Sequence, residues 1–268
     1  MKGWKKAAQF LEHIPEAINF IPRGWNEYGD AIVIKLSSEG WKYANVIGEA
    51  LLKATRKKSI FAQRSINGIT RKPDLVLIAG EDIEKVYFEE LGARFVMPIK
   101  EVMFSRGNHG EKVRLIKLVR EGECIVDLFA CIGQWSIVLG VNTKAKRIDA
   151  IDINPTAVEY LRENIELNKL QSKVFAHLGD CREVAPKDAA DRVIAGVIFE
   201  PEKFIETEVS TIRKRGIIHY HYLSKTPNND EIKKIFSQYA TVYSIESHLV
   251  KSYAPSVFHY VADVEVEK

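Results

Sequence analysis

The sequence predicts an α/β protein in which a doubly wound, mostly parallel sheet follows a smaller α+β domain. Three observations carry this prediction. In the second half of the chain, apolar runs of strand length alternate with segments of helical spacing. One of these runs, Cys124–Leu128, is apolar except for a single aspartate, which suits a strand buried on both faces. The first part of the chain instead has several short β-rich runs around one helical segment. We therefore expect domains at residues 1–100 and 101–268.

The elements of the N-terminal domain are bounded by polar and turn-forming residues. Ala31–Leu36 alternates like a strand, and Ser37-Ser38-Glu39 can cap a helix that continues from Trp41 to Leu51 at helical spacing. Four further short strands are expected, at Ser59–Phe61, Leu75–Ala79, Lys85–Phe88 and Arg94–Val96.

The elements of the C-terminal domain alternate in the order expected of a parallel sheet. Strands are expected at Cys124–Leu128, Arg147–Ile151, Lys173–His177, Arg192–Ile198 and Gly216–Tyr222. Helices are expected at Ser136–Val141, Pro155–Asn168 and Pro201–Lys214. Two last strands, near Thr241–Val250 and Phe258–Val266, would form an antiparallel addition at one edge.

Composition excludes several classes of protein. No stretch approaches the roughly 18 apolar residues of a membrane span, and the N-terminus lacks the features of a signal peptide. The cysteines Cys124, Cys131 and Cys181 form no CxxC pair and no even set, which favours a reducing cytoplasm. The histidines offer no metal-ligand spacing, so we expect no metal.

Basic residues are concentrated near the N-terminus. Residues 1–72 contain 13 Lys and Arg against 6 Asp and Glu, and Lys53–Lys72 contains no acid. This distribution indicates a polyanionic partner, with a merely solvated face as the alternative. The candidate RNA contacts are Arg56, Lys57, Lys58 and Arg64.

Acidic or glycine-containing turns follow the first three strands of the second domain. Val126–Gly133 places an aspartate and a small-residue turn after the first strand, and Asp152 ends the second, where it can accept from ribose hydroxyls. Gly179-Asp180-Cys181 follows the third, where an acceptor and a backbone N–H can read adenine. A helix cap is the alternative for each aspartate alone. GxGxxG is absent, which argues against a dinucleotide and favours S-adenosylmethionine (SAM), a nucleoside cofactor without phosphate.

At these residues the chain resembles two related archaeal and eukaryotic families that act at position 37 of tRNA. One is the tRNA (guanine-37-N1)-methyltransferases. The other is the wybutosine-synthesizing aminocarboxypropyltransferases, which transfer the 3-amino-3-carboxypropyl group of SAM to a wyosine precursor in tRNA(Phe). The resemblance rests on IPRGW–GDAIVIKL (Ile21–Leu36), MFSRGN–EKVR (Met103–Arg114), VDLFACIG (Val126–Gly133), AIDINP (Ala150–Pro155), ADRVIAG (Ala190–Gly196), GIIHYH (Gly216–His221) and KSYAPSVFHYV (Lys251–Val261).

The choice between the two families rests on a few positions. The methyltransferases usually have the motif F-S-P-R, and this chain has Gly107 at the position of the Arg. They usually have N-L-P after the fourth strand, and this chain has Gly196 at the position of the Asn. Loss of that Arg and Asn removes groups suited to guanine deprotonation and oxygen stabilisation. The resemblance therefore implies transfer of the aminocarboxypropyl group to C7 of 4-demethylwyosine in tRNA(Phe), with no obligate protein partner. Guanine-37-N1 methylation and a non-catalytic paralogue that binds tRNA and SAM remain the alternatives.

The resemblance also implies roles for particular residues. Ser105 and Lys112 would contact the methionine end of SAM, and Asp152 the ribose. Asp180 and Cys181 would contact adenine, and Phe129 and Gly133 would line the cofactor site. A helix cap is the alternative for Ser105, a surface charge for Lys112 and a core position for Phe129.

Two positions depart from the family pattern, and two histidines are left open. Cys131 replaces a usual glycine, which either changes the turn or narrows the methionine channel. Lys112 stands where the family usually has Arg, so the charge is kept but the bidentate hydrogen bonding of a guanidinium to a carboxylate is lost. His219 and His221 lie either near the target base or in a structural pair, and no catalytic residue is assigned.

Overall fold

The computed structural model describes residues 3–268, which form two compact units. The first unit runs to Glu89 and also includes Arg94–Met103. The second comprises Glu90–Ala93 and Phe104–Lys268. Residues Glu90–Ala93, at the turn of a hairpin whose strands are otherwise in the first unit, therefore belong to the second unit.

The first unit contains a four-stranded sheet in the order β1-β2-β3-β4, with β2 and β3 parallel and the other pairs antiparallel. Its strands are β1 (Asn26–Tyr28), β2 (Ala31–Ile34), β3 (Ser59–Asn67) and β4 (Lys72–Gly80), followed by the hairpin strands β5 (Lys85–Glu90) and β6 (Ala93–Pro98). Its helices are α1 (Gly3–Gln9), α2 (Pro15–Ile18), η1 (Glu39–Tyr43, a 3₁₀ helix) and α3 (Ala44–Thr55).

Helix α3 supplies much of the core of this unit. Ile47 and Leu51, one turn apart, are fully buried and belong to the same cluster as Ala7 of α1 and Ile32 of β2. At the expected cap, the N–H of Gly40 in η1 donates to Oγ of Ser37 at 3.2 Å, but Ser38 and Tyr43, the N-cap residues of η1 and α3, make no side-chain cap bond. A helix and strands occur where the sequence predicted them, with different bounds: the α-helix begins at Ala44 rather than Trp41, β2 ends at Ile34, and β3 and β4 are longer than the sequence indicated.

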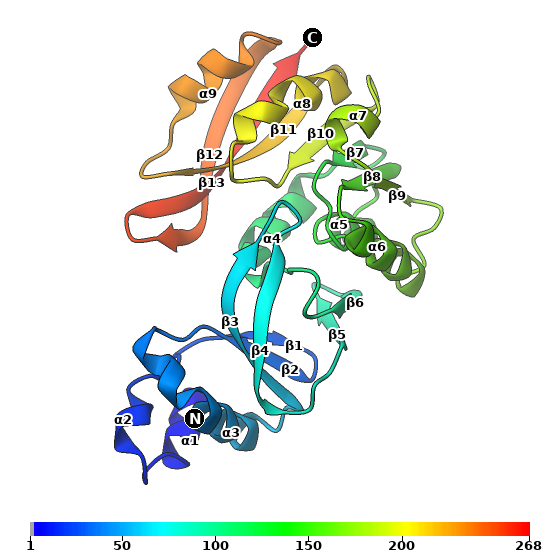
Figure 1. Ribbon diagram of the computed structural model, residues 1–268. Helices are drawn as coiled ribbons and strands as arrows, with labels where there is room; N and C mark the ends of the chain where they lie inside the picture. Colours follow the sequence, from blue (N-terminus) through cyan, green and yellow to red (C-terminus); the bar gives the residue numbers. More distant parts are fainter. Residues whose placement is uncertain (1–2) are drawn as a thin grey trace. The chain divides into compact units, whose positions relative to one another are not determined.

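The second unit is built on a seven-stranded sheet in the order β12-β13-β11-β10-β7-β8-β9 (Figure 1). Strands β7 to β11 are parallel to one another. The strands are β7 (Cys124–Asp127), β8 (Arg147–Asp152), β9 (Val174–Leu178), β10 (Ala190–Ala195), β11 (Ile212–Ser224), β12 (Thr241–Ala254) and β13 (Val257–Glu267). The helical segments are η2 (Arg106–Asn108), α4 (His109–Leu118), α5 (Ser136–Asn142), α6 (Pro155–Leu167), α7 (Cys181–Val184), η3 (Pro201–Phe204), α8 (Ile205–Thr211) and α9 (Asn229–Phe236).

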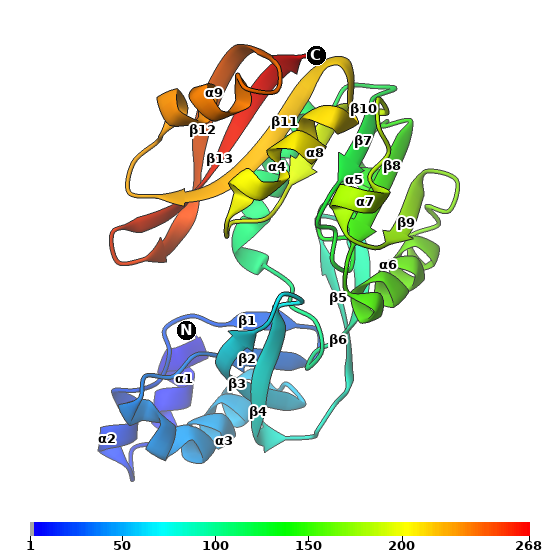
Figure 2. The ribbon, with the colours of Figure 1, turned by 45° about the horizontal axis from the view of Figure 1, so that its top comes forward.

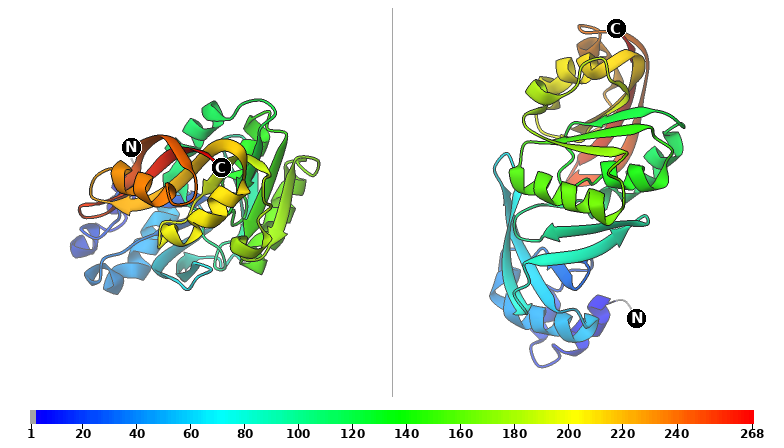
Figure 3. Two further views of the ribbon diagram at one scale, coloured as in Figure 1. Left: turned by 90° about the horizontal axis from the view of Figure 1, so that it is seen from above. Right: turned by 90° about the vertical axis from the view of Figure 1, so that its right-hand side faces the viewer.

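The two faces of this sheet carry different chemistry. Tyr220 and Tyr222 of β11 pack in one apolar cluster with Val209 of α8 and Phe236 of α9. Figure 3 (left) shows α8 and α9 on the same side of the sheet. Because neighbouring residues of a strand point to opposite faces, His219 and His221 lie on the other face. The sheet therefore has one apolar face and one face with buried polar groups.

The last two strands extend the sheet as an antiparallel hairpin, as the sequence predicts (Figure 2). Other expectations were wrong in their bounds: the strand expected at Arg192–Ile198 ends at Ala195, and the helix expected at Pro201–Lys214 ends at Thr211, so that β11 begins at Ile212. The reason is pairing across the sheet, because Arg215 opposes Glu267 of β13 in the register and its side chain forms an ion pair with Glu265 at 2.8 Å. Within residues 3–268, no helix is both long and apolar enough to span a bilayer.

Candidate cofactor and substrate site

The strand order of the second unit reverses between β7 and β10. From β7 the chain adds β8 and β9 on one side, and then β10 and β11 on the other. Ligands of doubly wound sheets bind at the carboxyl edge beside such a reversal. The turns Leu128–Trp135, Ile153–Asn154 and Gly179–Asp180 follow β7, β8 and β9. The structure therefore brings the three sequence motifs to this edge.

Asp127 holds the first turn together from inside. Its carboxylate is fully buried and accepts from Oγ of Ser136 at 2.5 Å, at the start of α5. Burial raises the pKa of Asp127 to about 7, because the hydrogen bonds from Ser136 and Phe129 offset the desolvation only in part. Asp127 thus joins the end of β7 to the start of α5.

The turn itself depends on two residues in the left-handed region. Cys131 has φ +52° and Gly133 has φ +94°. A Cβ on Gly133 would lie 2.4 Å from Cγ1 of Ile137, so only glycine fits there. Cys131 therefore adopts a backbone conformation in which glycine has less strain than a residue with a Cβ. Burial and the nearby Asp152 charge raise the pKa of Cys131 to about 12, so its thiol is neutral.

Asp152 connects the first two turns. Its Oδ2 accepts from the N–H of Cys131 at 2.7 Å, and its Oδ1 accepts from the N–H of Asn154 at 2.9 Å. These two bonds fix the plane of the carboxylate at the end of β8. An oriented acceptor at this position fits the ribose hydroxyls of a nucleoside cofactor.

Asp180 and Cys181 begin α7. Asp180 is the N-cap of this helix, and its Oδ1 accepts from the N–H of Arg182 at 3.0 Å while its carboxylate also pairs with the Arg182 guanidinium. Cys181 is buried in the apolar cluster, and burial raises the pKa of its thiol to about 12. The peptide N–H of Gly179 donates to the carbonyl of Asp152 at 3.1 Å, which ties this turn to the second one.

Phe129 lies between the turn and the apolar face. Its half-buried ring meets Phe204 edge-on with ring centroids 4.9 Å apart, and it packs against the core cluster. Most contacts of Phe129 are therefore those of a core residue, which was the alternative to a cofactor-lining role.

Ser105 joins the cofactor turn to the C-terminal hairpin. Its N–H donates to Oε1 of Gln134 at 2.8 Å, and its Oγ accepts from Nζ of Lys251 at 2.9 Å. The same ammonium donates to Oδ1 of Asn108 at 2.7 Å. Ser105 is the residue before η2, but its side chain makes no cap bond to that helix.

Lys112 is buried rather than exposed at the surface. Its Nζ forms an ion pair with Glu90 and lies 4.2 Å from the ring centroid of Phe104. Burial lowers its pKa and the Glu90 charge opposes that shift. The surface alternative for Lys112 was therefore wrong, and its charge is compensated inside the second unit.

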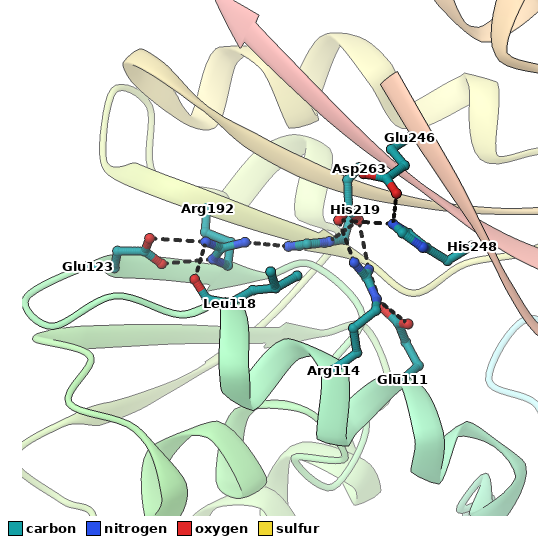
Figure 4. A network of polar contacts seen from close by, with 9 residues as sticks. All are labelled: Glu111, Arg114, Leu118, Glu123, Arg192, His219, Glu246, His248 and Asp263. Carbon is teal, nitrogen blue, oxygen red and sulfur yellow. Dashed lines mark hydrogen bonds and ion pairs between the residues drawn. The ribbon is translucent and has the colours of Figure 1, made fainter. Parts of the chain in front are cut away.

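A polar network lies on the second face of the sheet (Figure 4). It comprises Glu111, Arg114, Leu118, Glu123, Arg192, His219, Glu246, His248 and Asp263. Arg114 of α4 forms bidentate contacts with Asp263 at 2.5 and 2.8 Å, which hold the helix against β13. The network thereby fixes the helix that follows the Ser105 segment.

The two histidines left open by the sequence occupy different surroundings. His219 lies between Asp263 and Arg192 within the network, which is the structural pairing considered above. Nδ1 of His221 lies 2.8 Å from Nε2 of His259, and its ring centroid lies 5.5 Å from that of Trp135. Burial and the neighbouring His259 hold the pKa of His221 well below its ordinary value. Both rings are therefore neutral and buried.

The candidate RNA contacts lie in the first unit and differ in availability. Lys57 donates to the carbonyl of Gly29 at 2.7 Å, and Lys58 pairs with Asp30 at 2.8 Å. Arg56, at the end of α3, is exposed. Arg64 is exposed over the ring of Trp41, with a separation of 5.2 Å.

Sequence reasoning missed three contributors: Gln134, Lys251 and the Arg114–Asp263 pair. Lys251 and Arg114 fall in the segments KSYAPSVFHYV and EKVR, but their pattern gave no indication of their partners more than 140 residues away. No cluster of three or more His, Cys, Asp or Glu suited to a metal occurs among residues 3–268.

Three features accompany the doubly wound sheet: a glycine-type turn after its first strand, an oriented aspartate after its second, and an antiparallel hairpin at one edge. Together they define a class I SAM-dependent transferase. Comparison with known families agrees. The TRM5/TYW2 methyltransferase domain matches residues 86–246, and the TYW2 N-terminal domain matches residues 8–83. The chain belongs to the TRM5/TYW2 family.

Relatives from both branches of the family are similar along nearly the whole chain. The tRNA(Phe) (4-demethylwyosine(37)-C(7)) aminocarboxypropyltransferase of Pyrococcus horikoshii is 33% identical, over 94% of this chain and 92% of the relative. The tRNA (guanine(37)-N(1))-methyltransferase Trm5b of Methanocaldococcus jannaschii is 34% identical, over 97% of this chain and 75% of the relative. Overall identity therefore does not separate the two branches.

A solved structure extends the similarity to the whole fold. The crystal structure of P. horikoshii TYW2 in complex with MeSAdo superposes with a TM-score of 0.84 at 29% identity, and the match covers 99% of each chain.

Proposed function

We propose that this protein transfers the 3-amino-3-carboxypropyl group of SAM to C7 of 4-demethylwyosine at position 37 of tRNA(Phe). The match to the TYW2 N-terminal domain and the similarity to a TYW2 structure with bound MeSAdo (5′-methylthioadenosine) support this branch of the family. The guanine-37-N1-methyltransferase is the second candidate, because Trm5b is as similar in sequence.

The observation that favours the aminocarboxypropyl branch concerns the side chains that lie next to Gly107 and Gly196. A Cβ on Gly196 would lie 3.2 Å from Nε1 of Trp135, and a Cβ on Gly107 would lie 3.0 Å from Cδ of Lys251. These are the positions at which methyltransferases usually have Asn and Arg. Trp135 and Lys251 lie beside these glycines, and the groups suited to guanine N1 chemistry are not present at the two positions.

The residues around the carboxyl edge suit the binding of SAM. Asp152 would accept from the ribose hydroxyls, and Asp180 with Cys181 would lie at adenine. Gly133 and Phe129 would line the turn, and Ser105 would contact the methionine end. Lys112 would support that end indirectly, by holding Phe104 in place next to Ser105.

The protein's contribution to the reaction is orientation. When bound, SAM would supply a γ-carbon activated by its sulfonium: C7 of the base would bond to this carbon as the S–Cγ bond breaks, 5′-methylthioadenosine would leave, and the proton of C7 would be lost to water. Ser105, fixed by Gln134 and Lys251, sets the position of the methionine arm. Alignment of this kind lowers barriers by several kcal/mol, roughly 7–11 in the best intramolecular cases.

The tRNA would be held in part by the basic region of the first unit. Arg56 and Arg64 are exposed, whereas Lys57 and Lys58 contact main-chain or acidic groups of their own unit. We therefore assign the main phosphate contacts to the two arginines, with the two lysines in a secondary role.

The proposal is tested by the identity of the modified nucleoside. The protein is incubated with SAM and with tRNA(Phe) that carries 4-demethylwyosine, and the nucleosides are analysed by mass. A mass increase equal to one aminocarboxypropyl group supports the proposal. No change with this tRNA, together with N1-methylguanine formed on unmodified tRNA, would assign the protein to the methyltransferase branch.

A further inference from the structure

Lys251 lies at the same edge of the sheet as the cofactor turn. Strand β12 runs antiparallel to β13, which runs antiparallel to β11, so β12 and β11 end at the same edge. Lys251 is opposite His259 in β13, and His259 in turn is opposite Leu223 near the end of β11. The C-terminal hairpin thus brings a cation to the carboxyl edge.

A local irregularity in β12 accompanies the placement of this side chain. The register of β12 against β13 shifts between Leu249 and Lys251, and again between Ser252 and Ala254. Such bulges bend a strand and re-aim its side chains. Lys251 is half-buried and reaches Ser105 and Asn108, which lie more than 140 residues earlier in the chain.

The contacts of Lys251 place its charge beside the cofactor turn. Its Nζ donates to the neutral oxygens of Ser105 and Asn108, at 2.9 and 2.7 Å. Ser105 is itself bonded through its N–H to Gln134, which belongs to the turn after β7. The chain of contacts from Lys251 to this turn therefore has only two steps.

The other lysine expected at the methionine end has its charge compensated. Lys112 forms a buried ion pair with Glu90, and its ammonium lies over the ring of Phe104. A buried ion pair presents little net charge to a ligand. A carboxylate is bound more strongly by a cation than by a neutral donor, and the ammonium of Lys251 contacts Ser105.

We propose that Lys251 binds the α-carboxylate of the methionine moiety of SAM and thereby sets the direction of its side chain. This assignment rests on the proposed function for the placement of the methionine end at Ser105. It concerns binding alone, so it can be tested without tRNA and whichever group is transferred.

The test compares three ligands by calorimetry: SAM, decarboxylated SAM and 5′-methylthioadenosine. Lys251→Met removes the charge and keeps the length of the side chain, and Lys251→Arg keeps the charge. Lys234→Met is the matched control, because Lys234 is exposed on α9 in the same unit. Circular dichroism and melting temperature check that each variant is folded.

We expect Lys251→Met to weaken SAM binding by about 10- to 100-fold, the range for a hydrogen bond to a charged group. Binding of decarboxylated SAM and of 5′-methylthioadenosine should change less than about twofold. Lys251→Arg should restore most of the SAM affinity, and Lys234→Met should bind all three ligands like the wild type.

Two outcomes overturn the assignment. Equal weakening of SAM and decarboxylated SAM would mean that Lys251 acts only by holding the Ser105 segment. Unchanged SAM affinity in Lys251→Met would mean that the carboxylate is bound elsewhere. Neither outcome bears on which group is transferred, so the proposed function would stand or fall separately.

Discussion

Nδ1 of His219 lies 2.7 Å from Oδ1 of Asp263 on the neighbouring strand. On the other side of the ring, Arg192 donates from NH1 to Nε2 at 2.6 Å. Because a guanidinium has no acceptor, Nε2 must accept and the proton must lie on Nδ1. Burial, the largest influence, lowers the pKa of His219, so the ring is a neutral donor to Asp263. This geometry assigns His219 to structural support.

Asp263→Asn should lower the free energy of unfolding by about 1–3 kcal/mol at pH 7, because it removes one of the two carboxylates that pair with Arg114, the other being Glu111. Burial opposes ionisation of Asp263, but hydrogen bonds from Arg114 and His219 outweigh it and hold its pKa well below the ordinary value of 3.8. The stabilisation is therefore present above pH 4 and is lost as the pH falls below it. Urea unfolding of both proteins at pH 7, 5 and 3 measures this. A stability difference that does not shrink at pH 3 would contradict the assignment.

Asp127→Asn should show the opposite dependence on pH. The pKa of Asp127 is raised to about 7, so the folded wild type loses stability as the pH rises from about 4 to 7. An amide at this position can still bond to Ser136 but does not ionise. The stability of the variant relative to the wild type should increase by roughly 1–3 kcal/mol between pH 5 and pH 8. Thermal unfolding over this range provides the measurement, and a constant difference would show that Asp127 ionises normally.

Cys131→Gly should leave the free energy of unfolding unchanged or raise it by up to about 1 kcal/mol. The reason is the φ of +52°, which a residue with a Cβ adopts only with strain. SAM affinity should be equal or greater, because removal of the side chain widens the turn. Cys181→Ala is the control, since Cys181 is a core residue and its truncation should destabilise the fold. A large loss of stability in Cys131→Gly would show that the thiol packs in the turn without strain.

Arg56→Gln combined with Arg64→Gln should weaken tRNA binding and reduce the slope of log affinity against log salt by roughly two units. Lys57→Gln combined with Lys58→Gln should have a smaller effect, because these lysines already contact Gly29 and Asp30. Filter binding between 50 and 300 mM salt, roughly the range in which phosphate contacts dominate, compares the two pairs. An unchanged slope for the arginine pair would make this region a solvated surface.

Local patterns in the sequence predicted the succession of strands and helices along the second unit and the positions of the turns after β7, β8 and β9. Alternation and capping depend on neighbouring residues, so Cys124–Asp127 and the cap at Ser37 could be anticipated. The end of the helix before β11 could not, because the start of this strand depends on distant partners: Ile212 pairs with Ala190 of β10, and Arg215 pairs with Glu267 of β13. The partners of Lys112 and Lys251 also depend on long-range packing, which a single sequence does not encode locally.

The short helix α9 shows the same limit. Ile232 and Phe236 are one turn apart and bury against the apolar face, yet they are separated by the charged pair Lys233-Lys234 in a polar stretch. The amphipathic pattern comprises only Ile232, Ile235 and Phe236, about one helical turn, which is too short to distinguish a helix from a loop. Contact with Tyr220 of β11 then stabilises the helix.

The most direct test of the central claim follows the fate of two labels in SAM. The protein is incubated with tRNA(Phe) bearing 4-demethylwyosine and with SAM labelled either in the methyl group or in the carboxyl group. The account predicts that the carboxyl label enters tRNA, that the methyl label does not, and that 5′-methylthioadenosine accumulates in equal amount. Methyl label in tRNA with S-adenosylhomocysteine as the co-product would contradict it, and so would the absence of both labels from tRNA when SAM and tRNA are shown to bind.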